Sequence, residues 1–86
     1  MLKEVHGRTE SGQDYIEYQA LTGWNFVAQE SGGMWFIFKV PRDGTPGYVS
    51  TLDQSSDKEQ AVRKALTLAQ NHHRDFGYGI GVKVIS

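Results

Sequence analysis

Apolar residues are most concentrated at positions 32–40, GGMWFIFKV. Side chains alternate between the two faces of a β-strand. One face of a strand here would collect four apolar side chains, namely Met34, Phe36, Phe38 and Val40. The opposite face would carry Trp35, Ile37 and Lys39. The pattern therefore predicts a strand that is apolar on both faces, which raises the question of what covers the second face.

Similar stretches rich in strand-forming residues, each bounded by turn residues, predict further strands along the chain. They lie at residues 2–9, 15–21, 24–30, 48–53 and 78–86. Thr22-Gly23 and Ser31-Gly32-Gly33 are typical of tight connections. The segment PRDGTPG at 41–47 predicts a long hairpin loop.

One helix is predicted, at about 57–75. Ser56 and Glu59 have the spacing of a capping box, and Glu59 and Arg63 form a favourable i,i+4 pair. An apolar stripe of helical period consists of Ala61, Val62, Ala65, Leu66, Leu68 and Ala69. The fold class is therefore α+β, a mostly antiparallel, twisted sheet of four to six strands with one main helix on one face, followed by a C-terminal strand.

The packing prediction places this helix on the more apolar face of the central strand. Val62, Leu66 and Ala69 are then buried, and the sheet side chains beneath them are Phe26, Phe36 and Phe38. A helix is about 10–12 Å across and covers about two to three strands. It leaves the other face, with Trp35 and Ile37, without cover.

Three explanations for that second face remain open. The sheet curls until both faces are internal, the face pairs with another copy of the chain, or it docks a different molecule. The partner-binding residues predicted from this face and the adjoining loop are Trp35, Ile37, Lys39, Val27, Trp24, Arg42 and Tyr48.

Composition narrows the function classes. The 86 residues predict a single domain, 1–86, with one modest core. There is no cysteine, so neither a disulfide nor a thiolate metal site is expected. No stretch has the length and apolarity of a signal peptide or membrane span, which favours a cytoplasmic protein. A net charge of −1 lacks the basic excess of most nucleic-acid binders.

Motifs for catalysis and cofactors are weak. Gly77, Gly79 and Gly81 follow a predicted helix, the reverse of the order in nucleotide-binding loops, and predict either close backbone packing or a ligand slot. His72 and His73 are adjacent on a helix, so they do not suit one metal ion. No nucleophile or carboxylate pair is spaced for catalysis. We expect no catalytic residue, no metal and no cofactor.

These observations favour a non-enzymatic interaction protein that binds a protein partner through an aromatic sheet face. Its size is that of small regulators and inhibitors such as those encoded by phage and mobile elements. The alternatives are a sheet-based nucleic-acid binder, a small-ligand binder that uses the glycine-lined strand, and a homodimer. The strand–strand–helix order resembles, in layout only, the arm-binding domains of tyrosine integrases, and the basic strand positions of such a reader are largely absent.

Overall fold

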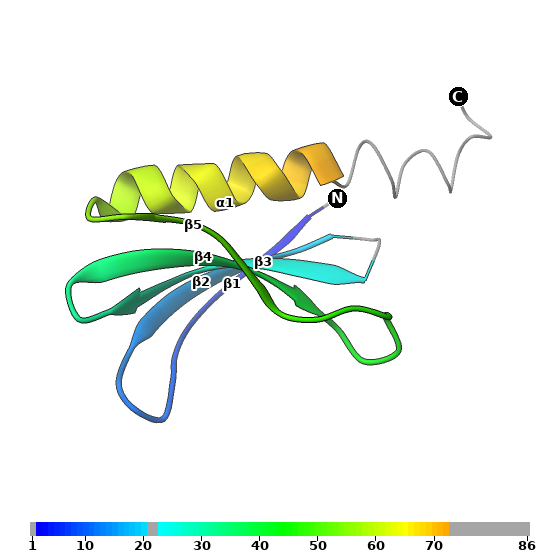
Figure 1. Ribbon diagram of the computed structural model, residues 1–86, viewed down its shortest axis with the longest axis horizontal. Coiled ribbons are helices and arrows are strands. Elements are labelled where there is room, and N and C mark those ends of the chain that lie inside the picture. The colour runs from blue at the N-terminus through cyan, green and yellow to red at the C-terminus, as the bar shows by residue number, and fades with distance from the viewer. Residues whose placement is uncertain (1, 21–22, 73–86) are drawn as a thin grey trace.

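The computed structural model describes residues 2–20 and 23–72. Within these ranges the chain forms five strands and one helix: β1 (Lys3–Arg8), β2 (Asp14–Gln19), β3 (Trp24–Ser31), β4 (Met34–Pro41), β5 (Ser50–Ser55) and α1 (Lys58–His72). The sheet order is β1-β2-β3-β4-β5, every neighbouring pair is antiparallel, and α1 lies along one face (Figure 1). The α+β prediction is confirmed.

All five strands lie within two residues of their predicted positions, and β5 begins at Ser50 instead of residue 48. The connection from β4 extends through Val49; in it Gly47 has a φ of +141°, and Tyr48 and Val49 are exposed. The predicted strand at 78–86, the glycines at 77–81 and the predicted end of the helix beyond His72 lie outside the described residues.

The helix covers the face of β4 opposite to the predicted one. Ile37 is 1% exposed and Trp35 is 8% exposed, and both pack in one core cluster with the buried alanines of α1. Lys58, at the start of α1, lies 5.6 Å from the centre of the Trp35 ring. We name this the covered face; its sheet residues are Ile16, Tyr18, Phe26, Ala28, Trp35 and Ile37.

The prediction that Phe36 and Phe38 pack under the helix is therefore wrong, although Phe26 does lie there. Strand register explains the error. The β3–β4 turn consists of two residues only, Gly32 and Gly33, both with positive φ. This turn pairs Val27 with Phe38 and Ala28 with Ile37, whereas a three-residue turn that included Ser31 would have placed Val27 on the face of Trp35. A one-residue slip exchanges the two faces of a strand.

The helix approaches the sheet closely because its inner stripe is alanine. Ala61, Ala65 and Ala69 are fully buried, whereas Val62 and Leu66 are only half-buried. The first turn is also capped differently from the prediction. The Asp57 carboxylate accepts a hydrogen bond from the backbone N–H of Glu59 at 2.9 Å, so Asp57, and not Ser56, is the N-cap. The predicted pair of Glu59 and Arg63 is present at 3.8 Å.

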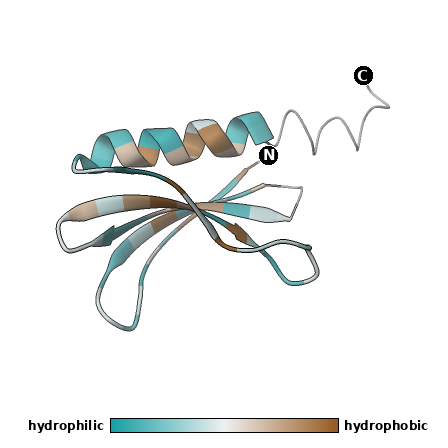
Figure 2. Ribbon diagram, in the orientation of Figure 1, coloured by the Kyte–Doolittle hydropathy of each residue, from teal (hydrophilic) through white to brown (hydrophobic). Residues whose placement is uncertain are grey.

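The most hydrophobic positions of the sheet lie near its middle, where the strands cross beneath α1 (Figure 2). The β1–β2 turn, residues 9–13, and the β4–β5 loop, residues 42–49, both extend to the side without the helix (Figure 1). The turn and the loop therefore bound the side of the sheet opposite α1.

Candidate functional site

The face of the sheet opposite α1 is the strongest candidate for a functional surface. No described element packs on it, yet its centre is apolar and aromatic. We name it the open face; its residues are Tyr15, Glu17, Val27, Gln29, Phe36, Phe38, Val40 and Thr51. All but the buried Val27 and the exposed Thr51 are half-buried. Apolar surface gathered in this way on one side of a small domain is typical of a binding surface.

Two hollows lie next to each other on the open face. The first, of about 340 Å³, is bounded by Val27, Phe38 and Val40 in its centre, and extends from Thr9 to Val49. The second, of about 320 Å³, lies between Phe36, Phe38 and the edge strand β5. Phe38 and Gln29 border both hollows. We call the two hollows together, with the turn and loop beside them, the trough.

One wall of the trough is the β1–β2 turn, and hydrogen bonds between glutamine side chains fix this turn to the sheet. The Gln13 amide donates a hydrogen bond to the Ser31 hydroxyl, and the Gln29 amide donates one to the Gln13 carbonyl, each at 3.1 Å. Tyr15 lies across the sheet from Gly7, whose missing side chain leaves room for the aromatic ring. This wall is therefore held in place before any partner binds.

The other wall is the β4–β5 loop, which Arg42 fixes at its base. The guanidinium donates hydrogen bonds to the backbone carbonyls of Ala20 and Trp24, at 2.5 and 3.3 Å, and to the side-chain carbonyl of Asn25. Further along the loop, Gly47 lies so close to the Trp24 ring that no side chain fits there. The loop is thereby anchored to the start of β3.

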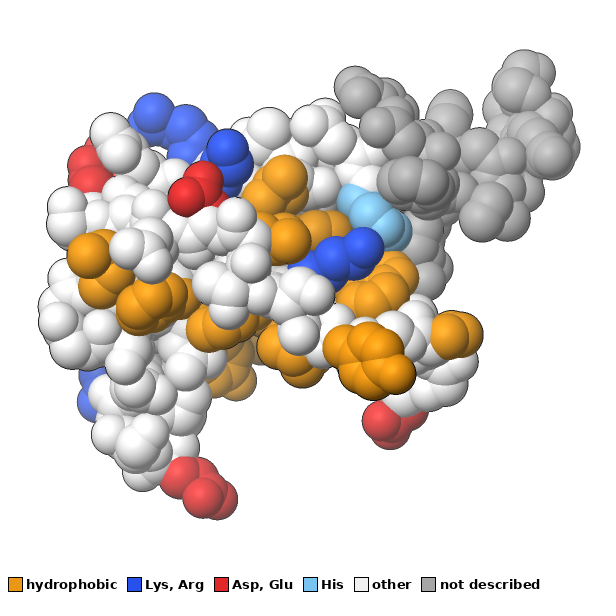
Figure 3. All heavy atoms as spheres, viewed as in Figure 1, with side chains coloured by type: hydrophobic (Ala, Val, Ile, Leu, Met, Phe, Trp, Pro, Cys, Tyr) orange, Lys and Arg blue, Asp and Glu red, His pale blue; other side chains and the backbone are white. Residues whose placement is uncertain are grey.

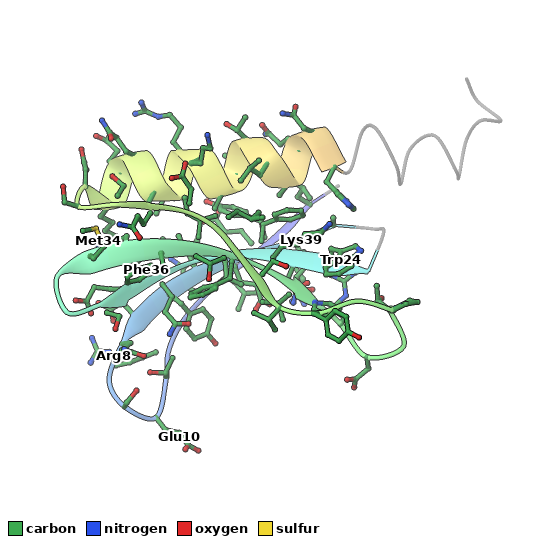
Figure 4. The ribbon with its side chains drawn as sticks, viewed as in Figure 1. Arg8, Glu10, Trp24, Met34, Phe36 and Lys39 are labelled. Atoms are coloured by element: carbon green, nitrogen blue, oxygen red, sulfur yellow. The ribbon has the colours of Figure 1, made fainter. Side chains whose placement is uncertain are left out.

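Charge on the trough is sparse and mostly negative. Glu17 lies in its floor and Lys3 is the cation that the described strands place on the open face. Glu10 lies at the tip of the β1–β2 turn, on the side away from α1 (Figure 4). The one carboxylate of the β4–β5 loop is Asp43, and acidic side chains stand out at the tips of both the turn and the loop (Figure 3).

The three carboxylates beside the trough form no ion pairs with described residues, unlike those of Glu4, Asp14, Asp53 and Glu59. Within the described part of the chain, none of Glu10, Glu17 and Asp43 lies within salt-bridge distance of a cation, although Glu17 accepts a hydrogen bond from Gln19 at 2.7 Å. By contrast, α1 carries Lys58, Arg63 and Lys64 against the single carboxylate of Glu59. Carboxylates without ion pairs therefore gather on the trough side, whereas α1 carries more positive than negative side chains.

The structure separates the seven sequence-predicted site residues. Trp35 and Ile37 are in the core beneath α1, because the helix covers their face, so the prediction that they form an open face is wrong. Lys39 lies over the Trp24 ring at 4.2 Å, on the same side of the sheet as the helix. Arg42 is engaged in the loop anchor described above.

The remaining two residues lie toward the open side or in solvent. Val27 borders the first hollow, although only 7% of it is exposed, and Tyr48 is 87% exposed in the loop. The residues that the prediction missed are the half-buried side chains of the open face: Tyr15, Glu17, Gln29, Phe36, Phe38 and Val40. The Gly32-Gly33 pair was the signal for them, because a two-residue hairpin turn places Val27 opposite Phe38.

A third hollow, of about 630 Å³, lies between α1 and β2. Its floor is Ile16, Val62 and Leu66, and its rim carries both signs of charge: Asp57, Lys58, Glu59 and Arg63. Because the rim already pairs Glu59 with Arg63, and Asp57 caps the helix, its charged groups are occupied within the fold. This hollow is a weaker candidate than the trough.

In the described part of the chain, no three His, Asp or Glu side chains gather as metal ligands. The pKa of the Tyr18 phenol is raised, first by burial and then by the neighbouring Glu4 carboxylate. Tyr18 belongs to the covered face, away from the trough. Among the described residues, no helix has the length and apolarity needed to cross a bilayer.

Comparison with known proteins adds no relative. The chain matches no protein-family model, and neither the curated proteins nor the solved structures yield a match.

Proposed function

We propose that this protein is a non-catalytic binding domain that docks another protein on its open face and so regulates or inhibits it. The observation that carries the proposal is the trough: aromatic and aliphatic side chains form its centre, and amides and hydroxyls surround them. Protein interfaces have this composition, with charge depleted at the centre and a polar rim.

The dimensions of the face agree with this function. Five strands spaced about 4.8 Å apart, each six to eight residues long at about 3.3 Å per residue, cover roughly 500–600 Å². A standard interface buries about 800 Å² on each partner. The open face therefore supplies most of one interface, and the adjoining turn and loop supply further contact area.

The charge pattern ranks nucleic acid below protein. A sheet that binds DNA or RNA presents cations to the phosphates, often with aromatic rings that stack on bases. The open face presents aromatic rings with Glu17, and Glu10 and Asp43 lie beside them. Of the described cations on this side, Arg8 is paired with Asp14 and Arg42 with carbonyl groups of the fold, which leaves Lys3. Phosphates would meet carboxylates there.

A photocrosslinking residue tests the proposal in the cells that naturally make the protein. Benzoylphenylalanine replaces Phe38 in one variant and Thr67, on the exposed side of α1, in a matched control. We expect discrete protein adducts from position 38 and none from position 67. Absence of protein adducts at 38, or the same adducts from both positions, would contradict the proposal.

A titration with mixed-sequence DNA and RNA at physiological salt addresses the second class of partner. We expect no submicromolar binding. If the protein instead binds nucleic acid with submicromolar affinity, and Phe38→Ser weakens that binding, the open face is a nucleic-acid-binding surface.

A further inference from the structure

The shape of the trough limits which kind of protein segment fits it. Its two hollows adjoin along β4, whose Phe36 and Val40 are about 13 Å apart at the usual rise of a strand. This length corresponds to about two turns of an α-helix. On the other face, α1 already shows that β2, β3 and β4 together accommodate one helix.

Backbone hydrogen bonding favours a helix over an extended segment. In the middle of the sheet, β3 is paired on both sides, with β2 and β4. A strand laid across this face would therefore find no backbone partners, and its own N–H and C=O groups would be buried without hydrogen bonds. An α-helix satisfies these groups internally, so only its side chains need to match the face.

The three carboxylates set the charge of the segment. Glu17 lies in the floor of the first hollow, and Glu10 and Asp43 lie on the turn and the loop that flank the trough. A second copy of the chain, docked by the same face, would bring three more carboxylates against these three, because a two-fold interface presents the same patch twice. A segment with lysine or arginine beside its apolar stripe would neutralise them.

From shape, backbone pairing and charge, we infer that the trough takes a basic amphipathic α-helix of the partner protein. Its apolar stripe fills the hollows on either side of Phe38, and its flanking cations lie against Glu10, Glu17 and Asp43. This inference rests on the proposed function and specifies the recognition element of the partner.

A model peptide tests the inference with the whole 86-residue protein. The probe is a fluorescently labelled peptide of about 18 leucines and lysines, long enough to form a helix, with leucine at helical spacing on one side. A second peptide has glutamate in place of lysine, and a third has the same residues as the first in scrambled order. Fluorescence anisotropy measures the dissociation constants.

We expect the leucine–lysine helix to bind and the glutamate and scrambled peptides not to bind. Phe38→Ser should weaken binding at least tenfold, as expected for a central aromatic anchor. Glu17→Gln should weaken it about threefold and reduce its salt dependence. Glu59→Gln, which removes an exposed carboxylate of α1, is the matched control and should leave binding unchanged.

Equal binding of the lysine and glutamate peptides, or equal effects of Glu17→Gln and Glu59→Gln, would overturn the inference. Circular dichroism establishes that each variant is folded, and Phe36→Ser replaces Phe38→Ser if the latter is not. Should the peptide fail to bind while position 38 still crosslinks to a protein in cells, the docking function stands and the helix is excluded as the recognised element. Should both experiments fail, the proposed function itself is wrong.

Discussion

The two faces of this sheet are made by the same strands and are both apolar at the centre, yet they differ in what accompanies the apolar groups. The covered face combines large side chains from the sheet with alanines from α1, and its members are almost fully buried. The open face combines aromatic rings with amides, a hydroxyl and a carboxylate, and most of its members are half-buried. Apolarity alone therefore does not distinguish a core from a binding surface; the neighbours of the apolar groups do.

The neighbouring residues Trp35 and Phe36 give the sharpest test of this comparison, because they point to opposite faces of β4. Trp35→Ala should lower the free energy of unfolding by about 3–5 kcal/mol, as for a core aromatic residue. Phe36→Ala removes a half-buried ring and should cost about 1 kcal/mol. Urea denaturation of both variants measures the difference. Equal losses would show that the open face is as much a core as the covered one.

The alanine stripe provides the second test, since it determines how closely α1 approaches the covered face. Ala65→Leu introduces a larger side chain where no space exists and should destabilise the fold by about 1–3 kcal/mol. Thr67→Leu, on the exposed side of the same helix, should change stability by less than about 0.5 kcal/mol. Thermal unfolding compares the two. Tolerance of leucine at position 65 would mean that the helix packs loosely on the sheet.

The cap of α1 gives the third and smaller effect. Asp57→Ala should cost about 1 kcal/mol, because the backbone N–H of Glu59 loses its acceptor. Ser56→Ala should change the stability by less than about 0.5 kcal/mol. Chemical denaturation of the two variants decides which residue caps the helix, and the reverse order of effects would restore the capping box centred on Ser56.

The smallest effect is expected at alkaline pH. The raised pKa of Tyr18 means that the folded protein holds the phenolic proton more tightly than the unfolded chain does. The resulting stability is fully present below the ordinary tyrosine pKa of about 10 and falls as pH rises above it. Tyr18→Phe should remove this part of the alkaline decline, as measured by unfolding at pH 8 to 11. An unchanged slope would exclude Tyr18 as its source.

Local sequence signals predicted much of the fold. Alternation and turn residues located all five described strands to within two residues, and the apolar stripe of residues 61–69 located the helix. Such signals act over a few residues, so they are readable without knowledge of tertiary structure. The start of β5 differs by two residues, since Tyr48 and Val49 are good strand formers that lie in a loop in the folded protein.

The candidate site was harder to predict because β4 is apolar on both faces. Alternation correctly divided Trp35 and Ile37 from Phe36 and Phe38, but it contains no information on which set meets the helix. That choice depends on side chains contributed by other strands, such as Ile16 and Ala28, and on the number of residues in one turn. The walls of the trough could not be predicted either, because the hydrogen bonds that hold them, Gln29 to Gln13 and Arg42 to Ala20, join residues that are far apart in the sequence.

The order of the strands has a consequence for how the protein folds. Each strand pairs with its neighbour in the chain, and the connections run from two residues, 32–33, to eight, 42–49. Closing such short loops costs little chain entropy, so every hairpin can form without waiting for a distant segment. The β3–β4 hairpin, with its two-glycine turn and aromatic strand, is the natural nucleus, and α1 docks once Phe26 and Ile37 lie side by side on the covered face. We expect refolding in milliseconds, with the sheet growing outward from the β3–β4 hairpin in both directions.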